Sequence, residues 1–352
     1  MTNPLRVVVV GSGIGAQHIR AFRAAPDLFE VAAICDIDPQ RASPIAEEHA
    51  IPELLTDFAA VVRRTDFDII DICTPPNLHF AQIRAAIEAG KHVICEKPIV
   101  GSLAELDQLE DLTRASGQQI MPIFQYRFGR GLQKLKYLVD RQLTGEAFVF
   151  NVDVAWWRSR DYYSVPWRGK RATELGGALL SQAIHAVDMV FYVLGPARTL
   201  FARTATRVNP IEVEDCVAIA IEMSDGSLGT ISVTLGSAAQ ISRHRFTFRN
   251  LSAESNTEPY ANSAEPWAFS SPEEKSDERI QRALTEFTPS AEGYEGQFRR
   301  FYDSLSRATP APVSLTDARR VLEFIAAVYY SAEKGERVSL PLSRTNPKYT
   351  EL

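Results

Sequence analysis

The first third of the chain alternates short apolar runs with segments whose apolar positions recur at helical spacing. The apolar runs are rich in Val and Ile and carry little polar alternation, which is typical of strands buried on both faces of a sheet. Strands that alternate with helices favour parallel pairing through crossover connections. The pattern therefore predicts a doubly wound, parallel α/β domain over residues 1–123, with strands in LRVVVVGSG, FEVAAICDID, DFDIIDICTPP and KHVICEKP.

Beyond residue 123 the strand-like segments become longer and alternate between apolar and polar positions. Two of them span residues 148–157 and 217–234, and the second contains Asp225-Gly226, a hairpin-turn signal. This pattern predicts a second α/β domain over residues 124–352 with an open, largely antiparallel sheet. The polar stretch 252–278, rich in Ser, Glu and Pro, predicts a long loop or flap, with disorder as the alternative.

Helix-end signals mark two long helices. Ser102 followed by Glu105 is a capping-box pattern, so we expect a helix to begin there. Ser314 and Gly335 bracket another helix as its N-cap and C-cap. A chain of 352 residues also exceeds the size at which one core usually keeps growing, which agrees with two domains.

A further helical segment, GGALLSQAIHAVDMVFYVLG at residues 176–195, is apolar almost all the way round. Ser181, His185 and Asp188 interrupt it. At about 100° per residue, a single helix places these three side chains on one stripe within roughly 60° of each other. We expect that stripe to face something polar, although in isolation a hydrogen-bonded core histidine is the favoured interpretation of His185.

Composition and charge narrow the classes of partner. The net charge of −6 includes no basic stripe, which argues against nucleic acid, and no stretch approaches the length of a membrane span. The N-terminus lacks the h-region of a signal peptide. The four cysteines show no CxxC spacing, which fits a reducing cytoplasm and argues against a metal site. We expect them to be small buried residues beside a ligand cleft. They are Cys35, Cys73, Cys95 and Cys216.

The first apolar run leads directly into a GxGxxG/A turn formed by Gly11, Gly13 and Ala16. Such a turn lets the backbone approach a pyrophosphate at a helix N-terminus. Asp36 lies at the end of the next apolar run. Its carboxylate would accept hydrogen bonds from the ribose hydroxyls and repel a 2′-phosphate, which favours NAD over NADP. A turn cap is the alternative for Asp36, and nearby Arg41 leaves NADP open.

Two further strand ends carry polar residues at the edge where open α/β sheets bind ligands. Thr74 and Asn77 follow one strand, with His79 interpreted as a polar residue that starts a helix. Lys97 follows another strand. A lone lysine after a strand is usually a solvated surface residue, but Pro98 fixes the backbone at the point where the cleft is expected. The predicted cofactor-binding residues are Gly11, Ser12, Gly13, Ile14, Gly15, Ala16, Asp36, Thr74, Pro75, Asn77, Glu96, Lys97 and Arg168.

The glycine turn, TPPNLH, EKP and the GG…H..D helix, in this order, resemble the glucose-fructose oxidoreductase, inositol dehydrogenase and rhizopine catabolism protein family, Gfo/Idh/MocA. The resemblance spans nearly the whole chain. It implies a Rossmann domain followed by an α/β domain whose open sheet often serves in oligomer contacts, hence a homodimer or homotetramer. It also implies a C-terminal helix that can pack back.

The family resemblance also implies the catalytic residues. In the family, the EKP lysine and the histidine of the GGGxxxDxxxH helix flank the substrate carbon opposite the nicotinamide, which implies Lys97 and His185. The polar stripe would then face the cleft between the domains, with His185 transferring a proton and Lys97 polarising the hydroxyl. Asp188 would hold His185 or a nearby backbone group.

This chain departs from the family pattern at two positions. Leu175 replaces the first glycine of the triplet, and Ser181 replaces the usual aspartate. A serine cannot share a proton load as a carboxylate can, but its hydroxyl can bond a substrate oxygen. The proton transfer is therefore left to His185 and Lys97, or to a water.

Aromatic residues beside arginine in WWRSRDYYSVPWRGK are typical of sugar and polyol sites, with structural packing of the tryptophans as an equal alternative. The run resembles a YY…WRG segment in one branch of the family, and FQYRF at 124–128 would reach the same cleft. The predicted substrate-binding residues are Ser181, Tyr162, Tyr163, Gln125 and Arg127, with Arg168 at the nicotinamide edge.

The sequence thus predicts an NAD(P)-dependent oxidoreductase acting on a secondary alcohol of a sugar, inositol or related cyclic polyol. Oxidation of a cyclic dihydrodiol is the nearest alternative. A non-catalytic sensor of nicotinamide nucleotides is another, since proteins of this architecture can bind the nucleotide without turnover. The loss of the usual aspartate at Ser181 leaves a sensor function as an alternative, whereas the presence of both Lys97 and His185 argues against that function.

Overall fold

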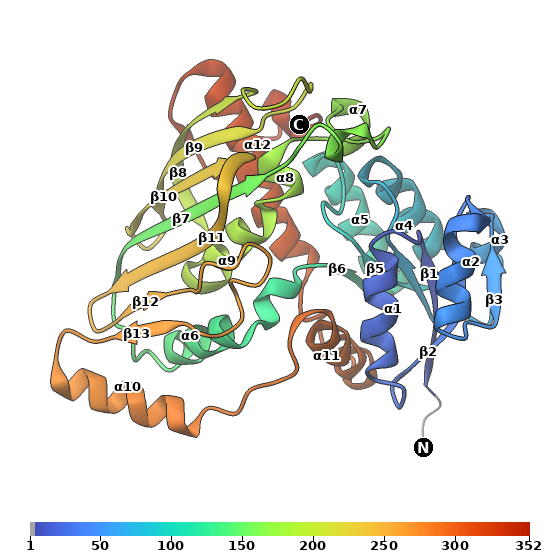
Figure 1. The fold of residues 1–352 in the computed structure, drawn as a ribbon, viewed down its shortest axis with the longest axis horizontal. Helices are drawn as coiled ribbons and strands as arrows, with labels where there is room; N and C mark the ends of the chain where they lie inside the picture. Colours follow the sequence, from blue (N-terminus) through green and yellow to red (C-terminus); the bar gives the residue numbers. More distant parts are fainter. Residues whose placement is uncertain (1–3) are drawn as a thin grey trace. The chain divides into compact units, whose positions relative to one another are not determined.

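The computed structural model describes residues 4–352, which form two compact units (Figure 1). Unit 1 extends to Ile123 and also contains Tyr294–Arg319; unit 2 contains Phe124–Gly293 and Arg320–Leu352. Residues 1–3, part of the segment judged not to be a signal peptide, lie outside the described range. Among residues 4–352 no single helix is long and apolar enough to cross a membrane, although the bent pair Arg171–Ser181 and Ile184–Leu194 passes that test together.

Unit 1 is built on a six-stranded sheet in the order β3-β2-β1-β4-β5-β6, and every strand pair is parallel. Residues at both faces of the inner strands are buried, because helices cover the sheet on both sides (Figure 1). The predicted doubly wound domain is confirmed. Its strands are β1 Leu5–Val10, β2 Phe29–Cys35, β3 Glu53–Leu55, β4 Ile69–Ile72, β5 His92–Cys95 and β6 Ile120–Pro122.

The helices of unit 1 follow the expected crossovers. Ser102 caps one of them, since its Oγ accepts from the Glu105 amide at 3.1 Å, while the Glu105 carboxylate accepts from the Gly101 amide at 2.8 Å. The helices are α1 Gly15–Arg23, α2 Pro39–Glu48, α3 Phe58–Val62, α4 His79–Glu88, α5 Leu103–Ser116 and α11 Gly293–Arg307, with a 3₁₀ turn, η1, at Pro76–Leu78.

Helix α11 differs from the sequence-based division, which assigned all of 124–352 to the second domain. Its residues from Tyr294 onward group with unit 1. The reason is aromatic packing: the Phe298 ring stacks on Phe22 with centroids 4.2 Å apart, and Tyr294 lies 4.5 Å from the His18 ring.

Unit 2 is built on an eight-stranded sheet in the order β13-β12-β11-β7-β10-β9-β8-β14. β10 pairs with β7 in parallel and the other pairs are antiparallel, which confirms the largely antiparallel sheet. Asp225 forms the predicted turn between β9 and β10, accepting from the Ser227 amide at 2.9 Å. The strands are β7 Ala147–Trp157, β8 Ala197–Ala205, β9 Cys216–Met223, β10 Leu228–Thr234, β11 Gly236–Phe248, β12 Ser252–Glu254, β13 Ala268–Ser270 and β14 Val338–Ser339.

The predicted loop over 252–278 is wrong in part. It contains β12, β13 and the first turns of α10 Glu274–Glu286, and these strands extend the sheet beyond β11. Ala253 is fully buried between half-buried Ser252 and Glu254, and Trp267 is nearly buried between exposed Pro266 and Ala268. A strand of three residues gives too short an alternation to stand out in such a polar stretch.

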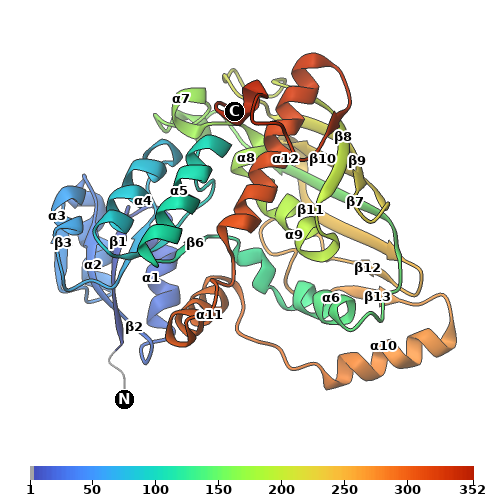
Figure 2. The same ribbon diagram turned by 180° about the vertical axis from the view of Figure 1, so that it is seen from behind.

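The helices of unit 2 include α9 and α12, which lie on one face of the sheet (Figure 2). α12 begins after the predicted cap Ser314, whose Oγ accepts from the Asp317 amide at 3.2 Å, and ends before Gly335 at φ +71°. Besides α10, the helices are α6 Arg130–Asp140, α7 Arg171–Glu174, α8 Ala178–Ser181, α9 Ile184–Leu194 and α12 Leu315–Lys334, of which α12 belongs to unit 2 from Arg320 onward; the 3₁₀ turns are η2 Gln125–Phe128, η3 Tyr162–Ser164 and η4 Pro347–Tyr349.

Candidate active site

The glycine turn follows β1, and its geometry requires glycine. Gly11 has φ +101°, and a Cβ there would lie 2.6 Å from the Cys73 carbonyl oxygen. At Gly13 the nearest atom to a Cβ would be an Arg41 guanidinium nitrogen at 3.7 Å, so the backbone is open on that side. Ser12 and Ile14 complete the turn, and α1 begins at Gly15, followed by Ala16. The open backbone at a helix N-terminus fits a pyrophosphate.

Asp36, at the end of β2, is buried against this turn. Its carboxylate accepts hydrogen bonds from the Ser12 amide at 2.7 Å, from the Ser12 hydroxyl, and from the Asp38 amide at 3.0 Å. Burial raises the pKa of Asp36, but the bonds from Ser12 and Asp38 and the charge of Arg41 outweigh it, and the net pKa is lowered. Asp36 therefore braces the glycine turn as an anion at the predicted position.

Two loops follow the adjacent parallel strands β4 and β5. Thr74 lies in the first, where its hydroxyl donates to Gln82 at 2.6 Å, beside Pro75 and the exposed Asn77. His79 does begin α4, as expected, but it is fully buried. Its ring nitrogens lie 2.8 Å from the Thr74 carbonyl oxygen and 2.8 Å from the Pro98 carbonyl oxygen. This histidine ties the loop after β4 to the EKP loop after β5.

The EKP loop carries a buried glutamate and a half-buried lysine. Glu96 accepts from the Lys97 amide through Oε2 at 3.0 Å, while Oε1 accepts from the Tyr294 hydroxyl at 3.1 Å. The glycine turn and the loops after β4 and β5 share the carboxyl edge of one parallel sheet, where such folds bind nucleotides. The residues of unit 1 therefore fit a dinucleotide.

In unit 2, the segment 176–195 is not the single helix that was predicted. α8 and α9 meet at Gln182 and Ala183, and the chain bends by 51°. Glu214 caps α8 by accepting from the amides of Gly177 at 2.9 Å and Leu179 at 3.0 Å. A Cβ at Gly177 would lie 1.9 Å from the Glu214 carbonyl oxygen, so this position requires glycine.

His185 lies in the first turn of α9 and is held by aromatic rings. Its ring stacks on Tyr126 with centroids 4.7 Å apart and an angle of 15°, and Phe124 presents its edge at 6.1 Å. Burial raises the pKa of the Tyr126 phenol, which is therefore neutral. Sequence reasoning missed both rings, although FQYRF shows aromatic residues on either side of Gln125 and Arg127.

Asp188 contacts a different partner from the one expected. Its carboxylate forms a bidentate ion pair with Arg127, at 2.8 Å to Nε and 2.6 Å to one terminal nitrogen, and both side chains are buried. The guanidinium also lies 4.9 Å from the centre of the Tyr192 ring. Arg127, predicted to bind substrate, thus anchors η2 to α9 through Asp188.

The aromatic segment before α7 folds onto the break between α8 and α9. The Tyr162 hydroxyl accepts from Gln182 Nε2 at 3.0 Å and from the Arg168 guanidinium, which also covers the Tyr162 ring at 4.1 Å. Tyr163 packs edge-on against Tyr162 at 5.0 Å. Half-buried Ser181 ends α8 beside Gln182, a residue that sequence reasoning missed because it occupied no motif position.

Two protein-family models match this chain. Residues 5–124 match the Gfo/Idh/MocA model of an oxidoreductase family with an NAD-binding Rossmann fold, and residues 132–249 match the model of the Gfo/Idh/MocA C-terminal domain. The chain belongs to the Gfo/Idh/MocA family. Membership makes it a nicotinamide-dependent dehydrogenase, as the glycine turn and the EKP loop indicate.

Named members of the Gfo/Idh/MocA family resemble the chain over most of its length. A D-glucoside 3-dehydrogenase of Escherichia coli is 25% identical over 96% of this chain and 98% of its own. A myo-inositol 2-dehydrogenase of Thermotoga maritima is 27% identical over 64% of this chain and 67% of its own. The structure of the WlbA dehydrogenase from Chromobacterium violaceum with NADH and UDP-GlcNAcA superimposes with a TM-score of 0.85 at 28% identity, covering 97% of this chain and 98% of that one.

Proposed function

We propose that the protein is a dehydrogenase of CH–OH groups that acts on a secondary alcohol of a sugar, inositol or related cyclic polyol. The observation that carries the proposal is the Lys97 loop, which lies beside the glycine turn at the carboxyl edge of the six-stranded sheet. Relatives named for glucoside and inositol oxidation support this class of substrate.

Oxidation of the alcohol removes one proton from the hydroxyl group and one hydride from the carbon. Bound NAD⁺ supplies the hydride acceptor at nicotinamide C4. The Lys97 ammonium polarises the substrate hydroxyl oxygen, and His185 takes the hydroxyl proton as the C–H bond breaks and the C=O bond forms. The ring of His185 keeps a fixed orientation for this step because Tyr126 and Phe124 hold it.

Polar groups near His185 support a hydroxyl-rich substrate. Within residues 4–352, the Oε1 atoms of Gln125 and Gln182 are buried and accept no hydrogen bond. A buried acceptor without a donor costs about 1–3 kcal/mol, so substrate hydroxyls are favoured partners for both. Ser181 lies next to Gln182 and adds a hydroxyl, and the ring of Tyr163 offers apolar surface for the C–H groups of a sugar.

A panel of sugars, inositols and cyclic polyols, incubated with NAD⁺ at alkaline pH, tests the proposal through absorbance of NADH. We expect turnover with at least one member, since removal of the product proton is favoured at high pH. Turnover only with cyclic dihydrodiols would show that the substrate is a dihydrodiol and not a sugar, inositol or related cyclic polyol. Tight NADH binding with no turnover on any substrate would favour the sensor function.

Cofactor choice follows from Asp36, and we expect wild-type protein to bind NADH more tightly than NADPH. Asp36→Asn should narrow that preference by about fivefold or more, because like charges about 4 Å apart repel by ~1 kcal/mol even in water. Calorimetric titration measures both dissociation constants, with Asp38→Asn as a matched acid two residues away. Tighter NADPH binding by the wild type would contradict the role given to Asp36.

Ser181→Ala should raise KM by about 2- to 10-fold, the scale of one hydrogen bond, with a smaller effect on kcat. The reason is that a serine at this position binds a substrate oxygen but carries no proton load. Ser164→Ala, at an exposed hydroxyl of η3, is the control and should leave both constants unchanged. A loss in kcat as large as that of a catalytic residue would mean that Ser181 takes part in the proton transfer.

We also propose that a second copy of the chain covers the sheet face of unit 2 opposite α9 and α12, giving a homodimer or homotetramer. Exposed apolar residues on that face, Val149, Trp157, Phe201 and Leu228, support this arrangement. Light scattering of the purified protein measures the assembly. A cytoplasmic location is the corresponding expectation from the four free cysteines.

A further inference from the structure

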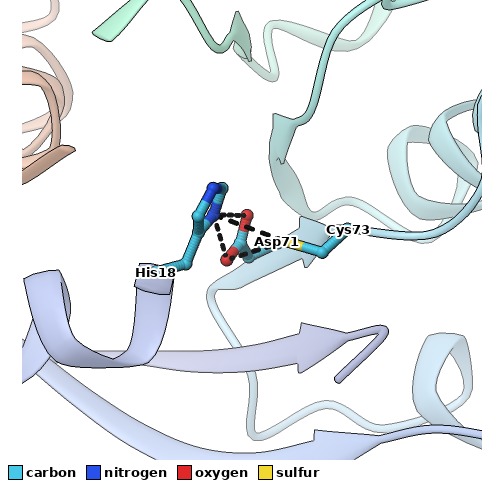
Figure 3. A group of neighbouring side chains, drawn as sticks. All are labelled: His18, Asp71 and Cys73. Carbon is cyan, nitrogen blue, oxygen red and sulfur yellow. Dashed lines mark hydrogen bonds and ion pairs between the residues drawn. The ribbon is translucent and has the colours of Figure 1, made fainter. Parts of the chain in front are cut away.

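Below the glycine turn lies a buried polar cluster that the proposed chemistry does not use. His18 projects from α1 toward Asp71 on β4 and Cys73 just after it (Figure 3). His18 and Asp71 are fully buried. The Nδ1 atom of His18 lies 2.9 and 3.0 Å from the two Asp71 carboxylate oxygens, and 3.4 Å from Cys73 Sγ.

The opposite nitrogen of the same ring extends the cluster to the EKP loop. His18 Nε2 lies 3.1 Å from Glu96 Oε1, the oxygen that also accepts from Tyr294 on α11. The second Glu96 oxygen accepts from the Lys97 amide. A continuous chain of hydrogen bonds therefore connects α1 and β4 to the backbone of Lys97.

The geometry of His18 places a carboxyl group on each side of the ring. Each ring nitrogen faces a carboxylate, and a neutral imidazole has only one N–H to donate. Burial disfavours the charged ring, but the Asp71 carboxylate outweighs it and holds the pKa of His18 well above its usual value. Burial also raises the pKa of Cys73 to about 12, so the sulfur is a thiol. The ring is thus a cationic bridge between Asp71 and Glu96.

The side chains of His18, Asp71 and Cys73 each offer a potential metal-ligand atom, and these atoms lie close enough together to hold a metal ion. Their spacing, however, is that of hydrogen bonds between the side chains themselves, and the Cys73 thiol would have to lose its proton to act as a strong ligand. The bridge to Glu96, which lies on the opposite side of the ring, has no part in such a site. The arrangement favours a hydrogen-bonded network.

We propose that His18 is a positioning residue for Lys97. By bridging Asp71 and Glu96 it fixes the Glu96 carboxylate, and Glu96 in turn fixes the backbone from which the Lys97 side chain reaches the substrate. This inference rests on the proposed function of Lys97. Loss of the bond to Glu96 loosens the carboxylate that holds the Lys97 amide, whereas loss of the bond to Asp71 loosens only the α1–β4 contact.

Two amide substitutions separate the two sides of the ring. Gln places its terminal nitrogen near the position of Nε2, so His18→Gln keeps a donor for Glu96; Asn places one near Nδ1, so His18→Asn keeps a donor for Asp71. We expect His18→Asn to lower kcat by about 10²-fold, the cost of a misplacement of about 1 Å, and His18→Gln to lose far less. NADH dissociation constants should change little in either variant.

Two further variants guard against effects of misfolding. Tyr294→Phe removes one donor to Glu96 and leaves the ring packing intact, so kcat should fall by about 2- to 10-fold with an unchanged melting temperature. His49→Gln replaces a histidine of unit 1 outside the network and should behave as wild type. Equal losses in His18→Asn and His18→Gln, or greater activity in His18→Asn, would overturn the proposal in favour of a purely structural role.

A second readout does not depend on turnover. After ¹³C reductive methylation, the NMR resonance of Lys97, assigned with Lys97→Arg, should move in His18→Asn and stay in place in His18→Gln. If it does so in a protein that oxidises no sugar, the positioning role stands and the proposed function fails. If sugars are oxidised while neither kcat nor this resonance responds to His18→Asn, the positioning role is wrong.

Discussion

Lys97→Ala and His185→Ala should each lower kcat by about 10²- to 10⁴-fold, the range of a general acid or base, with little change in NADH affinity. In the proposed mechanism both side chains act at the reacting hydroxyl, whereas the glycine turn and Asp36 hold the dinucleotide. Steady-state kinetics on the best substrate and fluorescence titration with NADH measure the two effects separately.

The double variant sharpens this prediction. If Lys97 and His185 serve one transition state, their losses are not additive, and the double variant should be only slightly slower than the worse single variant. Lys275→Ala and His49→Ala, at positions outside the site, are the matched controls and should keep wild-type rates. Wild-type rates in both single variants would mean that the assigned active site is wrong.

Breaking the buried Arg127–Asp188 pair should lower the free energy of unfolding by about 3–5 kcal/mol, because either single substitution removes the partner of a charge held away from water. Urea denaturation followed by circular dichroism measures Arg127→Met and Asp188→Leu. The combined variant should recover part of the loss, since it leaves neither charge buried.

An exposed pair provides the comparison for that measurement. Arg84→Ala breaks the Arg84–Glu88 pair on the surface of α4, at 2.8 Å, and should change the free energy of unfolding far less, because solvent screens this pair. A similarly small loss in Arg127→Met would contradict the view that this pair anchors η2, and with it Tyr126, to α9.

Local patterns predicted most of unit 1. The buried parallel strands, the glycine turn and the positions of Asp36 and Lys97 each depend on residues close together in sequence, so composition and spacing reveal them. The network around His18 does not, because Asp71 lies 53 and Glu96 lies 78 residues away. Helix α11 likewise joins unit 1 through rings that only the folded chain brings together.

In unit 2 the helical period misled the prediction of a single polar stripe. The break at Gln182 separates Ser181 from His185. The residue that caps the start of α8, Glu214, lies more than 30 residues away in sequence. The partner of Asp188 is 61 residues distant, so no local signal connects it to Arg127. Predictions based on neighbouring residues proposed a role for His185 but not the ring contacts around it.

Transfer of deuterium tests the central claim most directly. A substrate from the panel, deuterated at the carbon that bears the reacting hydroxyl, is incubated with NAD⁺ and the cofactor product is analysed by mass spectrometry. We expect one deuterium in the reduced nicotinamide and none in the reduced nicotinamide formed from the undeuterated substrate. Reduced cofactor without deuterium, or no reduced cofactor with any sugar or cyclic polyol, would contradict hydride transfer from a secondary alcohol carbon.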